Sequence, residues 1–140
     1  MFRSSSTYEQ LYARAHDLLI SMDLWEKRNE PVNTIAYGEQ RKLEIALSLT
    51  SEPKLLLLDE PSTGLTTTES ADIINMIRDL GTNITVIIVA HDMDLVFGVA
   101  ERIIVLHYGE VIADGKPKEI SNDSRVEEIY MGIKETKTSA

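Results

Sequence analysis

The sequence contains no cysteine and has a shortage of positive charge. Without cysteine, disulfide frameworks, thiolate nucleophiles and cysteine zinc sites are excluded. Asp and Glu outnumber Lys and Arg by 23 to 14, and the net charge of −9 disfavours a surface for nucleic-acid phosphates. The longest unbroken apolar run, Val86–Ala90, is far shorter than the ~18 residues of a spanning helix. We therefore expect neither a nucleic-acid partner nor direct membrane insertion.

The apolar residues that are present alternate between helical and strand patterns. The chain has 140 residues, 43% of them hydrophobic, which suffices for a buried core. Residues spaced as on one helix face predict helices over 8–22, 38–52, 66–80 and 92–100. Continuous apolar runs predict strands buried on both faces at Leu55–Leu58 and Ile84–Ala90, and Tyr108-Gly109 predicts a hairpin between 102–106 and 110–113. This alternation predicts an α/β fold with a parallel sheet and right-handed crossovers.

Polar residues follow both predicted buried strands. In open parallel sheets, ligands bind beyond the carboxyl ends of the strands. Asp59 and Glu60 follow the first strand, and His91 follows the second. An aspartate there can hold hydrated Mg²⁺, the next carboxylate can orient a water, and a histidine is a candidate catalytic group. For an Asp-Glu pair alone, capping of the following turn is the commoner explanation.

A set of short motifs strengthens the catalytic interpretation. In chain order they are Tyr37–Arg41 at a predicted helix start, Leu55–Pro61, Ser62–Leu65 and His91. They resemble the signature motif, Walker B segment, D-loop and switch histidine of the ATP-binding cassette (ABC) family. The Tyr-Gly-Glu-Gln-Arg signature, with 115–117 and 126–132, more specifically resembles ATP-binding subunits of branched-chain amino-acid importers. The resemblance covers residues 8–133.

This resemblance implies a P-loop NTPase (RecA-like) parallel sheet, with ATP and Mg²⁺ as cofactors. It places Asp59 at the magnesium ion, Glu60 at the attacking water and His91 at the γ-phosphate. It also implies nucleotide contacts across a dimer interface by Ala36, Tyr37, Gly38, Glu39, Gln40, Ser62, Gly64, Leu65 and Thr66. The family usually has serine at the position of Ala36, so we expect weakened binding across the interface. It usually has Asp or Asn at the position of Thr66, which we interpret as a helix cap.

The phosphate-binding loop G-x-x-x-x-G-K-[ST] is absent. Of the seven glycines only Gly115 precedes a lysine, and Pro117 comes next. We therefore expect residues 1–36 to be part of the helical subdomain, 37–133 the C-terminal part of the ATPase core, and 134–140 a tail. In the family, the strand before the loop lies between the strand ending at His91 and the strand at 102–106. We expect a gap there to favour self-association.

The expected function follows from the resemblance. A complete protein of this kind couples ATP hydrolysis to transport, here of branched-chain amino acids. Its implied partners are a homo- or hetero-dimer of cassette subunits and a membrane permease, at the cytoplasmic face of the cell membrane. Without the phosphate loop we expect the chain alone to be inactive. The alternative is a non-catalytic interaction module or remnant that pairs with a complete cassette. Chromosome-maintenance ATPase heads share some motifs but need heptad coiled coils, which this sequence lacks.

Overall fold

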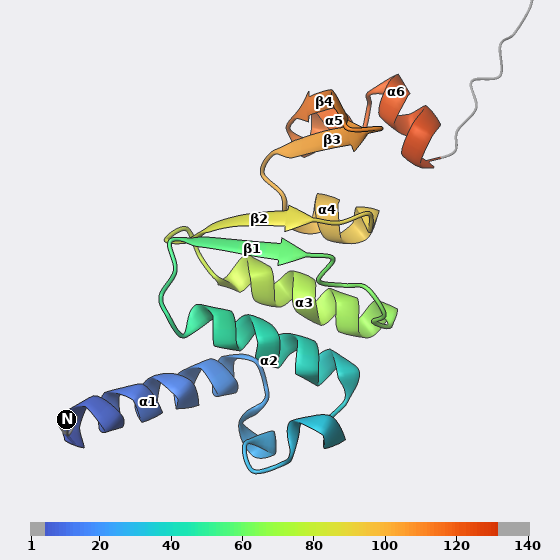
Figure 1. The fold of residues 1–140 in the computed structure, drawn as a ribbon. Coiled ribbons are helices and arrows are strands. Elements are labelled where there is room, and N and C mark those ends of the chain that lie inside the picture. Colours follow the sequence, from blue (N-terminus) through green and yellow to red (C-terminus); the bar gives the residue numbers. More distant parts are fainter. Residues whose placement is uncertain (1–4, 132–140) are drawn as a thin grey trace, which may run out of the picture. The chain divides into compact units, whose positions relative to one another are not determined.

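The structure, a computed structural model, describes residues 5–131 and has two compact units, one up to Leu95 and one from Val96 (Figure 1). The tail predicted at 134–140 lies outside the described residues. The first unit contains α1 (Ser5–Ser21), the 3₁₀ turns η1 (Trp25–Lys27) and η2 (Val32–Thr34), α2 (Tyr37–Leu49), β1 (Leu55–Asp59), α3 (Thr67–Asp79) and β2 (Thr85–Val89). Helix α4 (Met93–Val99) spans the boundary. None of the helices between residues 5 and 131 is long and apolar enough to cross a membrane.

The helices of the first unit share a small apolar core. Met22, Leu24 and Ala46 are buried together, and Met76 of α3 packs against them. Ile73 of α3 is fully buried. In Figure 1, α2 and α3 run side by side in the same direction, so their first turns are neighbours. The predicted helices are confirmed, with ends shifted by a few residues, as expected where caps rather than periodicity set the boundary.

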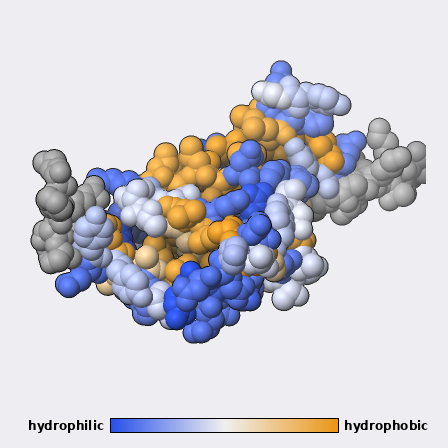
Figure 2. All heavy atoms as spheres, turned by 60° about the horizontal axis from the view of Figure 1, so that its bottom comes forward, coloured by the Kyte–Doolittle hydropathy of each residue, from blue (hydrophilic) through white to orange (hydrophobic). Residues whose placement is uncertain are grey.

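Strands β1 and β2 form a two-stranded parallel sheet, as predicted, in the register Leu55↔Thr85 to Asp59↔Val89. The prediction that both faces are buried is wrong. Leu56 is 5% exposed, whereas Leu57 is 66% and Ile87 is 52% exposed. Because side chains alternate along a strand, helix α3 covers only the set on its own side (Figure 1). Figure 2 shows many hydrophobic residues at the molecular surface.

The second unit is built on the predicted hairpin. Strands β3 (Ile103–His107) and β4 (Glu110–Gly115) pair antiparallel, and among the described residues they form a sheet separate from β1 and β2. Tyr108 and Gly109 both have positive φ, 47° and 82°, as tight hairpin turns require. The following elements are α5 (Pro117–Ile120), α6 (Ser124–Val126) and the π-helical turn η3 (Glu127–Met131). The buried side chains of Ile103, Val105, Ala113, Ile120 and Val126 form this unit's core.

Candidate functional site

The carboxyl ends of β1 and β2 lie side by side and carry the predicted catalytic residues. Asp59 is the last residue of β1 and is paired with Val89 of β2. The backbone N–H of Glu60 donates to the Val89 carbonyl oxygen over 2.7 Å, which extends the ladder one step beyond the strand. Glu60 itself has a left-handed φ of 48°, so the chain turns sharply at this residue. The sheet therefore delivers the Asp-Glu pair to its edge as the sequence predicts.

Glu60 and His91 are brought into direct contact. The His91 Nδ1 lies 2.9 Å from Glu60 Oε1, and Thr63 Oγ1 donates to Glu60 Oε2 over 3.2 Å. The hydrogen bond from His91, helped by the one from Thr63, lowers the pKa of Glu60 below its ordinary value. The same bond and the charge of Glu60 raise the pKa of His91. His91 remains 77% exposed, so this pair faces solvent and is accessible to a ligand.

The first turn of α2 is a second place where predicted residues gather. Ala36 precedes the helix and has no hydroxyl to cap it, while the Glu39 carboxylate accepts a hydrogen bond from the Ala36 N–H over 2.9 Å. Gln40 turns back and donates through Nε2 to the Ile35 carbonyl over 3.0 Å. Gly38 is buried. This turn presents backbone N–H groups, with the helix dipole, and has no serine to complete its cap.

The segment 62–66 packs against that turn. Gly64 has φ +80°, and a Cβ added there would lie 3.2 Å from the Tyr37 ring. Ser62 is buried, and its carbonyl accepts from the Leu65 N–H over 3.1 Å. Thr66 caps α3 by accepting a hydrogen bond from the Glu69 N–H, which confirms the predicted cap. The structure therefore joins the predicted signature and D-loop residues on one side of the first unit.

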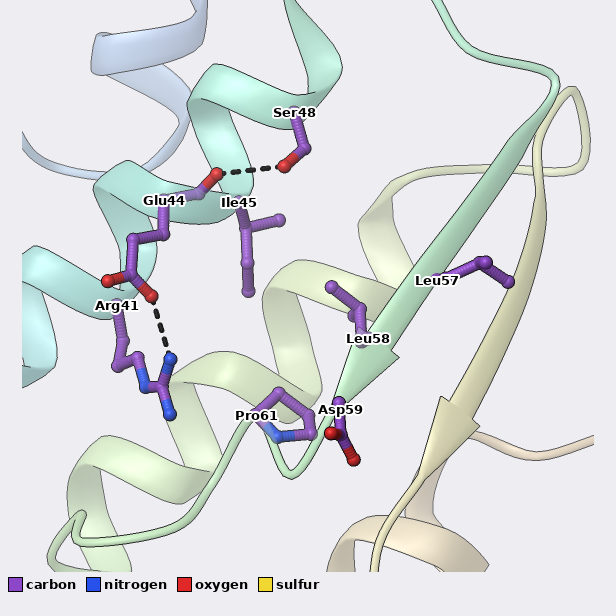
Figure 3. A pocket seen from close by; sticks show the side chains of 8 residues that line it. All are labelled: Arg41, Glu44, Ile45, Ser48, Leu57, Leu58, Asp59 and Pro61. Carbon is purple, nitrogen blue, oxygen red and sulfur yellow. Dashed lines mark hydrogen bonds and ion pairs between the residues drawn. The ribbon is translucent and has the colours of Figure 1, made fainter.

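A pocket of about 160 Å³ lies between α2 and the end of β1 (Figure 3). Its lining is Arg41, Glu44, Ile45, Ser48, Leu57, Leu58, Asp59 and Pro61. Arg41 donates to Glu44 over 2.7 Å, and the side chains of Ile45 and Leu58 extend into the space between helix and strand. The sequence pattern places Arg41 and Glu44 together on the polar face of this helix, but it did not predict that they line a pocket.

Asp59 is the only predicted metal ligand, and its surroundings restrict the kind of ion it suits. Within residues 5–131, no three side chains of His, Cys, Asp or Glu gather as a metal-binding group. A single carboxylate does not form an all-protein metal site. Mg²⁺, however, commonly takes one or two carboxylates and completes its shell with waters and substrate phosphates. Asp59 therefore fits Mg²⁺ that arrives with a nucleotide.

Comparison with known proteins places the chain in a family. The ABC transporter family model matches residues 3–63. The branched-chain amino acid transport ATP-binding protein LivG of Salmonella typhimurium is 39% identical over 121 residues, which are 85% of this chain and 48% of LivG. Its counterpart BraF of Pseudomonas aeruginosa is 39% identical over 133 residues, 94% of this chain and 51% of BraF. The chain thus spans about half the length of the curated relatives it matches.

Solved structures agree. The ADP conformation of an ATP-binding cassette from an ABC transporter superposes with a TM-score of 0.78 at 27% identity, covering 89% of this chain and 51% of that one. The chain therefore belongs to the ATP-binding domains of ABC transporters, and its predicted α/β, P-loop NTPase-type fold is confirmed. Within that class, LivG and BraF are among the proteins to which the chain is similar.

Proposed function

We propose that the chain supplies the water- and magnesium-handling residues, and the signature helix, of an ATP hydrolase subunit in an importer of branched-chain amino acids. The observation that carries this proposal is the Glu60–His91 pair at the carboxyl ends of adjacent parallel strands. The choice of solute rests on the similarity to LivG and BraF, which are branched-chain amino acid transport ATP-binding proteins.

Three side chains at the carboxyl ends of β1 and β2 would have separate roles in ATP hydrolysis. Asp59 would hold Mg²⁺, which when bound with ATP neutralises charge on the phosphate oxygens. The Glu60 carboxylate, kept ionised by the hydrogen bonds from His91 and Thr63, would accept a proton from a water and so orient it. Because His91 uses Nδ1 toward Glu60, its Nε2 is the nitrogen that would donate to a phosphate oxygen.

The first turn of α2 would act on a nucleotide held by a second cassette subunit. Its backbone N–H groups and dipole favour an anion. In our proposal Ala36–Gln40 and Ser62–Thr66 face the γ-phosphate of that partner's ATP. The missing hydroxyl at Ala36 removes one charge-assisted hydrogen bond, worth about 1.5–3 kcal/mol. Binding across the dimer is therefore weaker than with serine at this position.

The subunit would work at the membrane, and it would need a phosphate-binding loop for ATP hydrolysis. The proposed partner is a membrane permease, whose transport cycle would be driven by ATP hydrolysis. The subunit would bind this permease at the cytoplasmic face of the membrane. These 140 residues contain no phosphate-binding loop, so we expect negligible ATP hydrolysis by this polypeptide alone. Mg²⁺-dependent turnover by the purified chain that is lost in Glu60→Gln would contradict that expectation.

A chimera tests the function directly. The 133-residue segment of BraF that matches this chain is replaced by the matching residues of this chain, and ATP hydrolysis is measured with purified protein. We expect Mg²⁺-dependent hydrolysis that falls at least ~100-fold in Glu60→Gln and less in His91→Ala, because general-base catalysis typically contributes 10²–10⁴-fold. Glu101→Gln, an exposed carboxylate change, is the matched control and should leave the rate unchanged. A folded, inactive chimera, or full activity in Glu60→Gln, would refute the proposal.

The second candidate is a non-catalytic partner for a complete cassette. The observation that favours it is an intact first turn of α2 in a sequence without the phosphate loop. In that case tagged chain should co-purify with intact BraF only when ATP is present, and Gly38→Asp should abolish the interaction because it adds negative charge to the first turn of α2 and displaces the Glu69 carboxylate. Failure to co-purify with or without ATP removes this candidate.

A further inference from the structure

Glu69 connects two helix starts that the candidate site uses. It lies in the first turn of α3, and its Oε2 accepts from the Thr66 N–H over 2.9 Å and from Thr66 Oγ1 over 2.7 Å. These contacts complete a capping box, which accounts for a glutamate at this position from α3 alone. The same carboxylate, however, also reaches α2.

The contact with α2 is made at Gly38. The Glu69 carboxylate packs against the Gly38 backbone, and the nearby Gly38 amide helps to lower the pKa of this carboxyl. A Cβ added to Gly38 would lie 2.5 Å from Glu69 Oε1 and 2.8 Å from its carboxyl carbon, so only glycine leaves room for this approach. One carboxylate thus caps the start of α3 and lies against the start of the neighbouring α2, where both helix dipoles favour a negative charge.

A second contact one turn further along both helices supports this arrangement. Lys42 of α2 lies 2.9 Å from Asp72 of α3. Gly38–Glu69 and Lys42–Asp72 are thus successive ties between two helices that run in the same direction (Figure 1). The charged groups that face Glu69 are Asp72, which opposes its ionisation, and Lys42, which neutralises Asp72. The hydrogen bonds from Thr66, with the nearby Gly38 amide, outweigh Asp72 and lower the pKa of Glu69.

We propose that Glu69 is a positioning residue: its carboxylate ties the first turns of α2 and α3 together, so that Gly38 and the segment 62–66 keep fixed places relative to each other. Its functional consequence rests on the proposed function, in which both parts face the same phosphate. Glu69 itself touches no reacting atom in this scheme. It fixes the geometry of the groups that do, and displacements of about 1 Å in such groups can cost ~10²-fold in rate.

Nuclear magnetic resonance on the 140-residue chain tests the tie without any activity. We expect the Gly38 amide signal and the Glu69 side-chain carboxyl signal to titrate with one shared midpoint, below the ordinary 4.5 of glutamate. In Glu69→Gln, which keeps an acceptor and preserves folding, the Gly38 amide should lose that titration. In Glu69→Ala its hydrogen exchange should also accelerate. A Gly38 amide that titrates independently of Glu69, or is unchanged in Glu69→Gln, would overturn the proposal.

Glu119 provides a matched control. It caps α5 in the same way, accepting from the Lys116 N–H over 2.7 Å, and also lies against a glycine, Gly115, but it ties residues of one short segment only. Glu119→Ala should therefore leave the Gly38 amide unaffected. If Glu119→Ala changes that signal as much as Glu69→Ala does, the effect is general destabilisation and the tie is refuted.

The BraF chimera adds the functional measurement. We expect Glu69→Ala to lower kcat by about tenfold with little change in KM for ATP, Glu69→Gln to restore most of it, and Glu119→Ala to have no effect. An inactive parent chimera refutes the proposed function but not the tie, which the amide signals decide. An active chimera whose Glu69→Ala variant loses the Gly38 tie and keeps its rate would overturn the positioning role.

Discussion

The two units of the molecule use their charged side chains differently. In the unit up to Leu95, ion pairs and hydrogen bonds join elements that are far apart in the chain: His91 and Glu60 are 31 residues apart, and Lys42 and Asp72 are 30 apart. In the unit from Val96, the ion pairs among the described residues are local, and the more distant contact is a hydrogen bond from the Tyr130 hydroxyl to the Leu106 carbonyl. Arg102 and Asp114 lie across one hairpin, and Asp123 and Arg125 are two residues apart.

In the proposed function, the side chains that take part in the chemistry belong to the first unit, where such distant pairs occur. Local pairs stabilise a turn or a hairpin and need no further explanation. Pairs between distant elements fix the relative position of those elements, which a catalytic arrangement requires. Every candidate site residue, from Ala36 to His91, belongs to the first unit. If the comparison is correct, breaking a distant contact should affect more of the molecule than breaking a local one.

The largest expected effect is a loss of folding stability when a buried core residue of the first unit is truncated. Ile73 is fully buried on α3. Ile73→Ala should lower the free energy of unfolding by about 2–5 kcal/mol, from lost burial and the cavity left behind. The free energy of unfolding is measured by urea titration, with the fluorescence of Trp25, the single tryptophan, as the signal. Leu47→Ala, at a side chain 61% exposed, should change it by less than about 0.5 kcal/mol; equal shifts would contradict the described core.

A smaller effect should come from the Lys42–Asp72 pair. The Lys42 side chain is only 18% exposed, and its loss leaves the carboxylates of Asp72 and Glu69 facing each other without a cation. Lys42→Met should destabilise by about 1 kcal/mol, the upper part of the range for partly exposed pairs. The local pair Lys27–Glu30, at 3.5 Å, supplies the control, because Lys27→Met should cost less. A double-mutant cycle that combines Lys42→Met with Asp72→Asn measures the coupling energy between the two side chains. A coupling energy of zero would contradict the idea that this distant pair stabilises the first unit more than a local pair does.

The smallest effect is expected from Asp123 and Arg125 in the second unit. Hydrogen bonds from the Arg125 side chain and backbone lower the pKa of Asp123 from 3.8 to about 2. Because the pKa is depressed by folding, the stabilisation is present above pH 3.8 and is lost as pH falls through about 2. Carboxyl chemical shifts should show the midpoint moving back toward 3.8 in Arg125→Met and not in Arg28→Met. At neutral pH, neither variant should alter the Glu60–His91 contact.

Local pattern was sufficient to predict the elements and much of the site. Helical periodicity and the Thr66 cap predicted α3, and the Tyr108-Gly109 pair predicted the hairpin. The apolar runs followed by Asp59 and His91 predicted neighbouring strand ends. The burial of the strands could not be predicted in the same way. An apolar run indicates that both faces of a strand can be buried, but only the folded structure shows that the side chains of Leu57 and Ile87 are more than half exposed.

The contacts of the site were predictable only in part. Adjacent parallel strands made the approach of Glu60 and His91 an expected result, because their carboxyl ends share one sheet edge. The contact of Glu69 with Gly38 was not expected, because the capping box already explained the glutamate from its own helix. A residue with a sufficient local explanation can still have a second partner, and sequence spacing contains no information about it.

The left-handed backbone of Glu60 has a consequence for how this sequence can change. A non-glycine residue with φ of 48° carries strain of about 1 kcal/mol or more, which glycine would release. Glycine would also remove the carboxylate that contacts His91 and Thr63. Selection for folding alone and selection for the proposed chemistry therefore favour different residues here. In a library selected only for stability, position 60 should be among the first to lose its acid.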